Sequence, residues 1–385
     1  MPTAIVLGGG IGGLAAAIAL RRIGWQANVY ERAPEIREVG AGLTLWCNAM
    51  QAIDRLGLME PVLARASILS RGETRTAAGR LIMHNDLAGY EQWTGYPTVG
   101  VHRAELQKTL AEALPAESIH TDCQGTQIEQ SATGVTVRFA NGRTATGDVL
   151  IGADGIRSVV RQTLADPGPL RYAGYAAWRG ITSRLPDSQK PDEVRFAVGK
   201  GTQMGILPCG PGRVYWFITR NGPAGGEDPP GGHREAILQS FADWHPDFRG
   251  VIEGTPESTI IRGDILDRPP SDFWGKDRIS LLGDAIHATT PNLGQGACMA
   301  LEDAVVLADR LRHAEHPIAG LRDYENARKA RTAFIVKQSW MMGKVLQLDT
   351  GWLCWLRDRI SASKAGQRQS DRLLRKLVQV QLPVL

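Results

Sequence analysis

The N-terminal stretch alternates between short apolar runs and a glycine-rich segment. Residues 3–7 are apolar, glycines gather between residues 8 and 13, and residues 14–23 are rich in alanine and leucine at helical spacing. Residues 27–30 form a second apolar run that ends at Glu31. Short apolar runs bounded by turn residues are typical of buried strands. The pattern therefore predicts a βαβ unit and an α/β domain with a parallel sheet.

The next segment predicts a helix followed by a hairpin. Residues 103–114 have helical spacing, whereas residues 135–139 and 144–151 alternate or run apolar as strands do. Asn141-Gly142, between those two runs, is a strong signal for a tight turn. The second run leads into the turn-like segment Ile151-Gly-Ala-Asp-Gly155.

Strand-like stretches separated by proline- and glycine-rich links dominate the middle of the chain. They are residues 173–181, 193–198, 204–208, 214–219 and 258–265. A second, mainly β domain is the simplest interpretation.

A buried strand returns at residues 278–284, and helical spacing follows at 297–311 and from residue 318 on. The first domain is therefore expected to be completed by sequence that lies after the second. The predicted fold is α/β, a Rossmann-like domain with an inserted, mainly β domain and a C-terminal helical segment. The predicted boundaries are 1–171 and 276–345 for the two parts of the first domain, 172–275 for the inserted domain and 346–385 for the C-terminal segment.

The composition excludes several classes of protein. The 385 residues include 44 Lys and Arg against 40 Asp and Glu, and the surplus lies in residues 361–385, so no broad basic face for nucleic acid is predicted. The five cysteines are widely spread without a C-x-x-C pair, which favours a reducing cytoplasm over a disulfide framework or a zinc site. Neither a signal peptide nor an apolar run of the roughly 20 residues that a membrane span needs is visible.

The glycine segment is the first candidate for chemistry. Gly8, Gly10 and Gly13 satisfy G-x-G-x-x-G between a predicted strand and a predicted helix, and Glu31 ends the next strand. Such glycines permit a tight turn and close approach of a pyrophosphate, which the helix N-terminus then stabilises. A carboxylate at the position of Glu31 can accept hydrogen bonds from a ribose. The segment predicts a dinucleotide site and leaves NAD and FAD open.

Two later segments narrow that choice. They are Gly152-Ala-Asp154-Gly155 with Ser158 and Arg161, and Gly283-Asp284-Ala-Ile-His-Ala-Thr-Thr-Pro291 with Gly294-Gln-Gly296. Together with the first glycine segment, and in this order, they resemble the three fingerprints of the single-component FAD-dependent aromatic hydroxylases, the p-hydroxybenzoate hydroxylase-like monooxygenases. The resemblance covers about residues 1–345. Within the family, the sequence is most similar to the salicylate hydroxylase, urate hydroxylase and zeaxanthin epoxidase branches.

The resemblance implies bound FAD, NADH or NADPH as a transient co-substrate, and O₂. It implies a monooxygenase that hydroxylates or epoxidises an aromatic or polyketide-like small molecule through a flavin C4a-hydroperoxide. The first domain then binds FAD, and the inserted domain binds substrate. The implied cofactor-binding residues are Gly8, Gly10, Gly13, Glu31, Arg32, Gly42, Arg103, Asp154, Asp284, Gly294, Gln295, Gly296 and Ala297.

Some of these residues have plain structural alternatives. Asp284 is expected to accept from the ribityl hydroxyls, although a helix-capping role would suit it too. Asp154 and Arg157 could equally form a turn with a charge at a helix start, and Arg103 could be a surface arginine. The loop that ends at Gly296 leads into a helix, so its N–H groups and the helix dipole can stabilise a reduced flavin ring.

Candidate substrate residues come from the inserted domain, from the strand after Gly42 and from the loop that ends at Gly296. On the strand at 213–217 the period of two puts Arg213, Tyr215 and Phe217 on one face. Tyr215 is the first candidate for a pocket phenol, and for general-base help to a phenol substrate. Trp46, Gln203 and Pro291 complete the substrate candidates. Plain core packing is the alternative for Tyr215, Trp46 and Gln203. The resembling urate hydroxylases carry a basic residue where Gln203 stands, which argues against urate. Catalytic residues are otherwise unassigned, with Tyr215 and Pro291 as the only candidates.

Other residues receive structural interpretations. His287 has no Cys or His partner at ligand spacing, so no metal site is predicted. Cys298 is interpreted as a packing residue, and Ser158 lacks the G-x-S-x-G turn of a hydrolase. The W-x-W-x-I-P signature of flavin-dependent halogenases is missing from the sequence.

The C-terminal segment mixes tryptophan, methionine and leucine with basic residues. It predicts a cap over the site or a dimer face in a monomer or homodimer; the alternative is attachment to an anionic membrane. Two other functions stay open at this stage, a flavoprotein reductase or oxidase on the same fold and a non-catalytic FAD-binding protein.

Overall fold

The computed structural model describes residues 1–36, 41–165, 168–228 and 231–385. The helices are α1 (Ile11–Arg22), α2 (Cys47–Arg55), α3 (Met59–Leu63), α4 (Leu87–Thr94), α5 (Arg103–Glu112), α6 (Val159–Leu164), α7 (His233–Ser240), α8 (Pro246–Glu253), α9 (Asp284–His287), α10 (Gly296–His313), α11 (Pro317–Leu346), α12 (Gly351–Ala362) and α13 (Lys364–Val378). The 3₁₀ turns are η1 (Ala116–Ser118), η2 (Glu257–Thr259) and η3 (Pro291–Leu293).

The strands are β1 (Thr3–Leu7), β2 (Gln26–Tyr30), β3 (Gly42–Leu45), β4 (Ala66–Leu69), β5 (Arg71–Thr76), β6 (Leu81–Asp86), β7 (Thr98–His102), β8 (Ile119–His120), β9 (Gly125–Gln130), β10 (Val135–Phe139), β11 (Thr144–Gly147), β12 (Val149–Gly152), β13 (Arg171–Thr182), β14 (Glu193–Val198), β15 (Thr202–Pro208), β16 (Val214–Asn221), β17 (Ile261–Asp267), β18 (Gly275–Lys276) and β19 (Ile279–Leu281).

A six-stranded sheet in the order β18-β19-β12-β1-β2-β8 organises the first half of the molecule. Strand β1 pairs in parallel with β2 and β12, and β19 pairs in parallel with β12. Helix α1 packs closely against α10, because Ala15, Ala16 and Ala17 are fully buried small residues. The predicted N-terminal βαβ unit is thus present. The strand predicted at residues 278–284 is present too, but it is shorter than predicted, since β19 spans only Ile279–Leu281.

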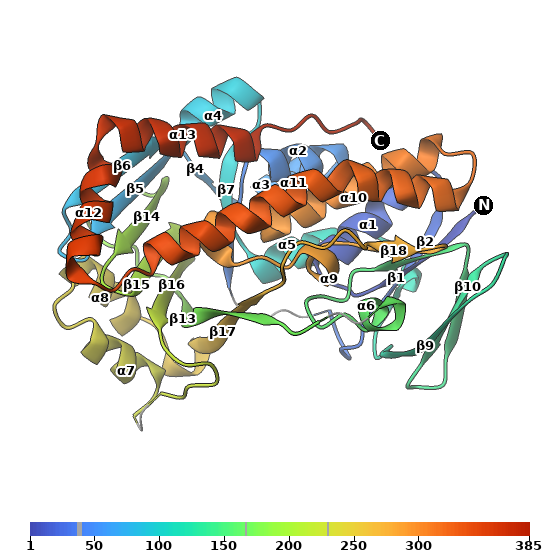
Figure 1. Ribbon diagram of the computed structural model, residues 1–385, viewed down its shortest axis with the longest axis horizontal. Helices are drawn as coiled ribbons and strands as arrows, with labels where there is room; N and C mark the ends of the chain where they lie inside the picture. Colours follow the sequence, from blue (N-terminus) through green and yellow to red (C-terminus); the bar gives the residue numbers. More distant parts are fainter. Residues whose placement is uncertain (37–40, 166–167, 229–230) are drawn as a thin grey trace.

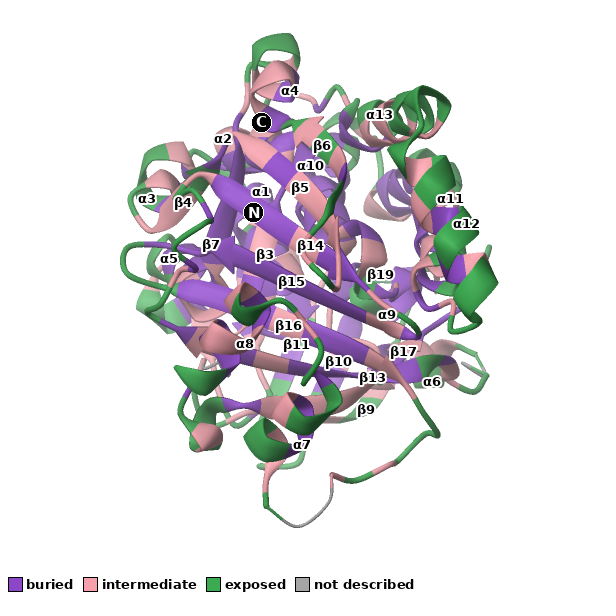
Figure 2. Ribbon diagram, turned by 90° about the vertical axis from the view of Figure 1, so that its left-hand side faces the viewer, coloured by how far each residue is buried: buried purple, intermediate pink, exposed green. Residues whose placement is uncertain are grey.

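A seven-stranded sheet in the order β17-β13-β16-β15-β14-β5-β6 forms the second half. Its neighbouring strands are antiparallel except for β14 and β5. One face packs its apolar side chains, Trp216 and Met204 among them, against α7 and α8. The other face packs against α4, β3 and α13 through a cluster that contains Tyr215 and Val378. Figure 2 shows this sheet as a largely buried layer between elements with exposed outer surfaces.

Several predicted elements differ from the structure. The run at 144–151 was expected to be one strand, but it divides at Asp148 into β11 and β12, which belong to different sheets. The strand expected at 258–265 begins only at Ile261, because η2 precedes it. The predicted mainly β segment also carries α7 and α8, whose apolar residues cover the sheet.

The C-terminal helices complete the molecule. Figure 1 shows α11 running along the length of the structure, with α12 at its end and α13 folding back toward the first half. The final residues are anchored there, since the Leu382 backbone N–H donates to Gln51 Oε1 at 3.0 Å. Among the described residues, no helix combines the length and apolarity needed to cross a membrane. The division at residues 171, 275 and 345 stays a proposal, and β5 and β6 from the first predicted part join the larger sheet.

Candidate functional site

The first glycine segment is a turn in which two glycines are required by packing and one faces open space. Gly8 has φ of +109°, and a Cβ there would lie 2.3 Å from the Ala153 carbonyl oxygen. A Cβ on Gly13 would lie 1.9 Å from the Gly8 carbonyl oxygen. A Cβ on Gly10 would meet no atom within 4 Å. Because α1 has neither a side-chain cap nor an acidic residue in its first turn, its N-terminus offers N–H groups to an anion beside Gly10.

Glu31 is part of the same turn. Its carboxylate accepts from the backbone N–H groups of Gly9 at 2.6 Å and Ala33 at 2.9 Å. Arg32, next to it, is exposed. Gln107 on α5 also holds the loop by donating to the Gly9 carbonyl oxygen at 2.8 Å, a contact that no local sequence signal indicates.

Asp154 of the second fingerprint caps a helix. Its carboxylate accepts from the N–H groups of Val159 at 2.7 Å and Val160 at 3.3 Å, at the start of α6. Burial raises the pKa of this carboxyl, against the effect of those hydrogen bonds. Arg157 is exposed, whereas Arg161 donates to the Ile286 carbonyl oxygen at 3.1 Å and so joins the second fingerprint to the third. The contacts of Asp154 match the structural alternative, and contact with a cofactor stays a prediction.

The third fingerprint places Asp284 at the start of α9, three residues beyond the end of β19 rather than on the strand as the sequence suggested. Asp284 is exposed. Arg103 at the start of α5 lies close enough for Asp284 to raise its pKa, although burial lowers that pKa overall. Arg103 is therefore half-buried rather than fully on the surface, and its contact with a cofactor stays a prediction.

The segment that we call the flavin loop, residues 291–296, comprises η3 and the residues that lead into α10 at Gly296. Gly294 has φ of +61°, and a Cβ there would lie 3.1 Å from Trp46 Nε1. Trp46 Nε1 is buried without a hydrogen-bond partner in the described ranges. Pro291 opens η3 and is exposed. Helix α10 begins at Gly296 without a side-chain cap or an acidic residue in its first turn.

A buried charge network, which sequence reasoning missed, holds the flavin loop. Asn48 on α2 donates to Gln295 Oε1 at 2.9 Å and to Glu302 Oε1 at 2.6 Å. Arg331 on α11 donates to both oxygens of Glu302, at 2.6 and 2.7 Å. Gln295 Nε2 is left buried without a partner among the described residues. The network therefore fixes the orientation of the Gln295 amide and leaves one donor unused.

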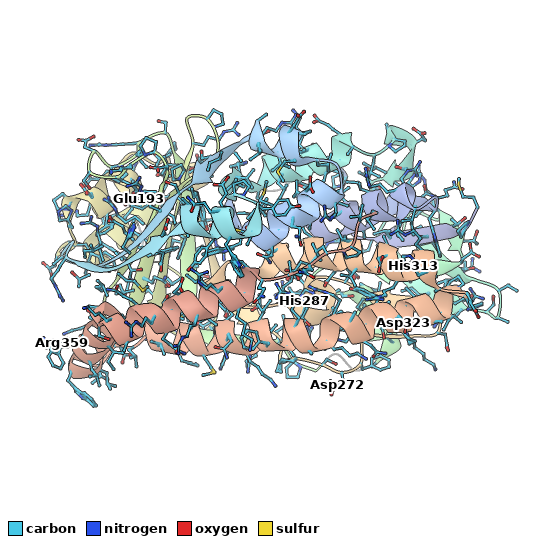
Figure 3. All side chains as sticks on the ribbon, turned by 90° about the horizontal axis from the view of Figure 1, so that it is seen from above. Glu193, Asp272, His287, His313, Asp323 and Arg359 are labelled. Atoms are coloured by element: carbon cyan, nitrogen blue, oxygen red, sulfur yellow. The ribbon has the colours of Figure 1, made fainter. Side chains whose placement is uncertain are left out.

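The same network reaches the other end of the third fingerprint. Arg328 bridges Glu302 at 2.7 Å and Asp303 at 2.6 Å, and His287 Nε2 lies 2.6 Å from Asp303 Oδ2. Burial alone would raise the pKa of Asp303, but His287 and Arg328 lower it to about 2. Figure 3 shows His287 in the interior of the molecule. His287 thus has a structural role, and within the described ranges no group of three or more His, Cys, Asp or Glu side chains could hold a metal ion.

The substrate candidates Tyr215 and Gln203 lie on the face of the seven-stranded sheet that is turned away from α7 and α8, which we call the inner face. Tyr215, paired with Leu207, and Phe217, paired with Gly205, alternate along β16, and Gln203 shares this face two residues before Gly205. A Cβ on Gly42 would lie 2.4 Å from Tyr215 Cβ, so a glycine is required where β3 crosses the tyrosine.

The phenol of Tyr215 is buried beside two arginines. Burial raises the pKa of its phenol to about 12, and Arg179 and Arg103 offset only part of that effect. At neutral pH the hydroxyl keeps its proton, which favours a donor role over the predicted general-base role; that role stays a prediction. Burial likewise raises the pKa of Cys298 to about 12, in line with its packing role.

Arg179 is the residue of this face that sequence reasoning missed. It pairs with Phe217 across β13 and β16 and lies close enough to affect the pKa values of both Tyr215 and Arg103. It is half-buried, and it forms no ion pair with a carboxylate of the described residues. A period of two on β13 combined with the register to β16 could have identified it, but the register is a tertiary property.

These features fit FAD. The open space at Gly10 and the uncapped N-terminus of α1 suit a diphosphate, and Asp284 offers acceptors to hydroxyls. The unused Gln295 donor and the uncapped α10 N-terminus suit the oxygen-rich edge of an isoalloxazine. The Gly12 Cβ position is only 3.2 Å from the Ala300 side chain, so the two helix N-termini lie together.

Comparison with known proteins agrees with this geometry. Residues 1–339 match the family model described as FAD binding domain. The chain is 38% identical over 377 residues to the aurachin C monooxygenase/isomerase of Stigmatella aurantiaca, covering 97% of each chain. It is 36% identical to an FAD-dependent urate hydroxylase of Klebsiella pneumoniae, covering 92% of this chain and 94% of that protein.

A solved structure with bound FAD is also similar to this chain. Klebsiella pneumoniae HpxO complexed with FAD and uric acid superposes with a TM-score of 0.92 at 32% identity, covering 98% of this chain and 97% of that one. The chain therefore belongs to the FAD-binding-domain family and is an FAD-dependent monooxygenase of the aromatic-hydroxylase type.

Proposed function

We propose that this monooxygenase uses NAD(P)H and O₂ to hydroxylate or epoxidise an aromatic or polyketide-like molecule that carries an acidic hydroxyl group. The observation that supports this substrate class is Arg179, a half-buried cation without a carboxylate partner among the described residues, next to the neutral phenol of Tyr215. Bound FAD, once reduced, supplies the chemistry that activates O₂.

The protein's own residues then have defined tasks. Arg179 holds an ionised substrate oxygen, which makes the ring more nucleophilic, and Tyr215 donates a hydrogen bond to the same or a neighbouring oxygen. The apolar cluster around Tyr215, with Phe217, Phe196 and Leu207, keeps water away from the reacting atoms. Gln203 contributes a neutral amide, so we expect urate to be a poor substrate.

Cofactor contacts are proposed for the residues predicted from the fingerprints. The turn at Gly10 and the α1 N-terminus would hold the diphosphate, Glu31 and Arg32 the adenosine side, and Asp284 and Arg103 the ribityl chain. Gly42, Gly294, Gln295, Gly296 and Ala297 would line the isoalloxazine, with Trp46 and Pro291 nearer the substrate. Asp154 would support this site from the start of α6.

The first experiment is the visible spectrum of the purified protein, followed by NAD(P)H oxidation with phenols, quinolones, purines and polyketide aromatics. We expect a yellow protein whose NAD(P)H oxidation is stimulated by a hydroxylated aromatic, with one added oxygen in the product mass. Stimulated oxidation without an oxygenated product would instead identify a reductase or oxidase. A flavin-bound protein that no compound stimulates would identify a non-catalytic FAD-binding protein.

The role of Arg179 is tested separately with a matched arginine. Arg220 lies on the outer face of the same sheet, 5.0 Å from the ring centroid of Trp178. We expect Arg179→Gln to raise KM about tenfold or more, since a hydrogen bond to a charged group contributes about 1.5–3 kcal/mol. Arg220→Gln should leave KM unchanged. Equal effects of the two substitutions would contradict the role of Arg179.

A further inference from the structure

Helix α12 presents large apolar side chains to the outside of the molecule. The exposed fractions are 66% for Trp352, 60% for Trp355, 40% for Leu356 and 56% for Ile360. Their spacing places them on one face, at i, i+3, i+4 and i+8. Figure 1 shows α12 at one end of the molecule, and Figure 3 labels Arg359 of the same helix at that outer edge.

The inner face of α12 is the polar one. Arg357 is 7% exposed and donates to the carbonyl oxygens of Gly199 at 3.3 Å and Leu346 at 3.2 Å. Cys354, also buried, donates to the Leu348 carbonyl oxygen at 3.1 Å. A helix on a water-facing surface normally turns its apolar stripe inward. Since α12 does the reverse, its outer face is suited to a partner less polar than water.

The neighbouring helix α13 has the ordinary orientation and a cationic outer face. Its Leu377 and Val378 are buried and Leu373 and Leu374 half-buried. Its exposed basic residues are Lys364, Arg368, Arg372, Arg375 and Lys376. The acidic residues of α12 and α13, Asp358 and Asp371, each lie 2.9 Å from an arginine nitrogen and add no free negative charge to this face.

We propose that α12 and the outer face of α13, together termed the docking face, bind the surface of a membrane that contains anionic lipid. Tryptophan side chains favour the headgroup level of a bilayer, and basic residues are attracted to an anionic lipid surface. A second copy of the chain is the less favourable occupant, because a two-fold contact would bring two cationic α13 helices together. The positive charge of α13 thus favours an anionic membrane over a second copy of the chain.

The docking face lies next to the wall of the substrate site. Leu374 and Val378 of α13 pack in the same apolar cluster as Tyr215, Phe217 and Trp46. A lipophilic aromatic dissolved in the bilayer is therefore delivered beside the site. This inference goes beyond the proposed function and does not depend on it, because binding to lipid can be measured without turnover.

The test is cosedimentation of the full-length holoenzyme with vesicles of phosphatidylcholine, with and without phosphatidylglycerol. We expect binding to the mixed vesicles, weakened but not abolished by high salt. The double variant Trp352→Ala/Trp355→Ala should bind about tenfold more weakly or worse, which corresponds to a loss of about 1.4 kcal/mol. Arg368→Glu/Arg372→Glu should lose the preference for phosphatidylglycerol.

Phe273→Ala is the matched control, because Phe273 is 43% exposed but lies in the loop before β18, outside α12 and α13. It should bind vesicles as the wild type does, and the flavin spectrum of every variant should be unchanged. Absence of wild-type binding to both vesicles would overturn the proposal. A dimer in light scattering that the tryptophan double variant abolishes would overturn it too, and would assign the face to a second copy.

Discussion

The glycine turn at residues 8–13 and the flavin loop at 291–296 both end at the N-terminus of a long helix, yet they are held in different ways. The glycine turn is fixed by contacts between backbones, such as the close approach of Gly13 to the Gly8 carbonyl oxygen. The flavin loop depends on the amide of Asn48 from α2 and on buried charged side chains of α10 and α11, with Glu302 at the centre. The glycine turn has further support from the neutral side chain of Gln107 and from the Glu31 carboxylate, whereas the support of the flavin loop is centred on buried ion pairs.

This difference predicts how each loop responds to substitution. A loop held by backbone packing should tolerate the loss of a carboxylate and fail when a methyl group is added. A loop held by buried ions should instead fail when a carboxylate is lost, because an unpaired charge left in the interior is costly. Four experiments test this contrast, from the largest expected effect to the smallest.

Glu302→Gln should lower the free energy of unfolding by about 3–5 kcal/mol, the cost of breaking a buried ion pair from one side. Glu302 is fully buried and pairs with both Arg328 and Arg331, so Arg331 would lose its carboxylate partner and Arg328 would keep only Asp303. Urea unfolding of the apoprotein measures the change. A loss below about 1 kcal/mol would place the flavin loop in the same class as the glycine turn.

Gly13→Ala should lower the free energy of unfolding by about 3 kcal/mol, because its methyl group would force the backbone at Gly8 to move. Gly10→Ala is the matched control, since a methyl group there meets open space. It should leave the unfolding midpoint of the apoprotein close to the wild-type value and weaken FAD binding about tenfold, measured by flavin fluorescence titration. Equal destabilisation by both variants would show that Gly10 is not the point where the cofactor approaches.

Asp303 makes the flavin loop sensitive to acid. Its pKa of about 2 lies below the ordinary value of 3.8, so its contribution to stability is complete above that ordinary value and is lost as the pH falls toward 2. The difference in unfolding free energy between wild type and Asp303→Asn should therefore shrink by about 2 kcal/mol over that range. Urea unfolding of both proteins along a pH series measures it. A constant difference would mean that the Asp303 carboxylate is not stabilised by its partners.

Glu31→Gln should have the smallest effect, a loss of about 1 kcal/mol in unfolding free energy. Glu31 is half-buried and accepts from two backbone N–H groups, one of which the amide oxygen can still serve. This substitution has the same chemistry as Glu302→Gln, so the ratio of the two losses measures the contrast between the loops directly. Similar losses of unfolding free energy in Glu31→Gln and Glu302→Gln would contradict the contrast between the two loops.

The contrast also explains which features could be predicted. Gly8, Gly10 and Gly13 lie within a few residues of one another, and the local pattern was sufficient for the βαβ unit that carries them. Glu302, Arg328 and Arg331 read as ordinary charges of amphipathic helices, and only their burial between α2, α10 and α11 gives them a role. Arg179 was missed for a similar reason, because its neighbours are set by strand register.

The errors in the strands have a local cause. The run at 144–151 first alternates and then runs apolar, but Asp148 between these parts accepts from the backbone N–H of Thr3 at 2.7 Å, at the point where the chain passes from one sheet to the other. Helices α7 and α8 were missed because they are short, and their apolar residues were part of a region dominated by strand signals. Tyr215 was located correctly on the inner face, but its protonation depends on burial, which the sequence pattern does not report.

The pairing of β19 with β12 has a consequence for synthesis of the chain. The parallel sheet that begins at Thr3 cannot be completed until Leu281 has left the ribosome, after most of the seven-stranded sheet has emerged. Contacts so distant in sequence slow folding and prolong exposure of unpaired strand edges. The nascent α1 must therefore wait for α10, its packing partner, and its apolar face stays uncovered during this interval.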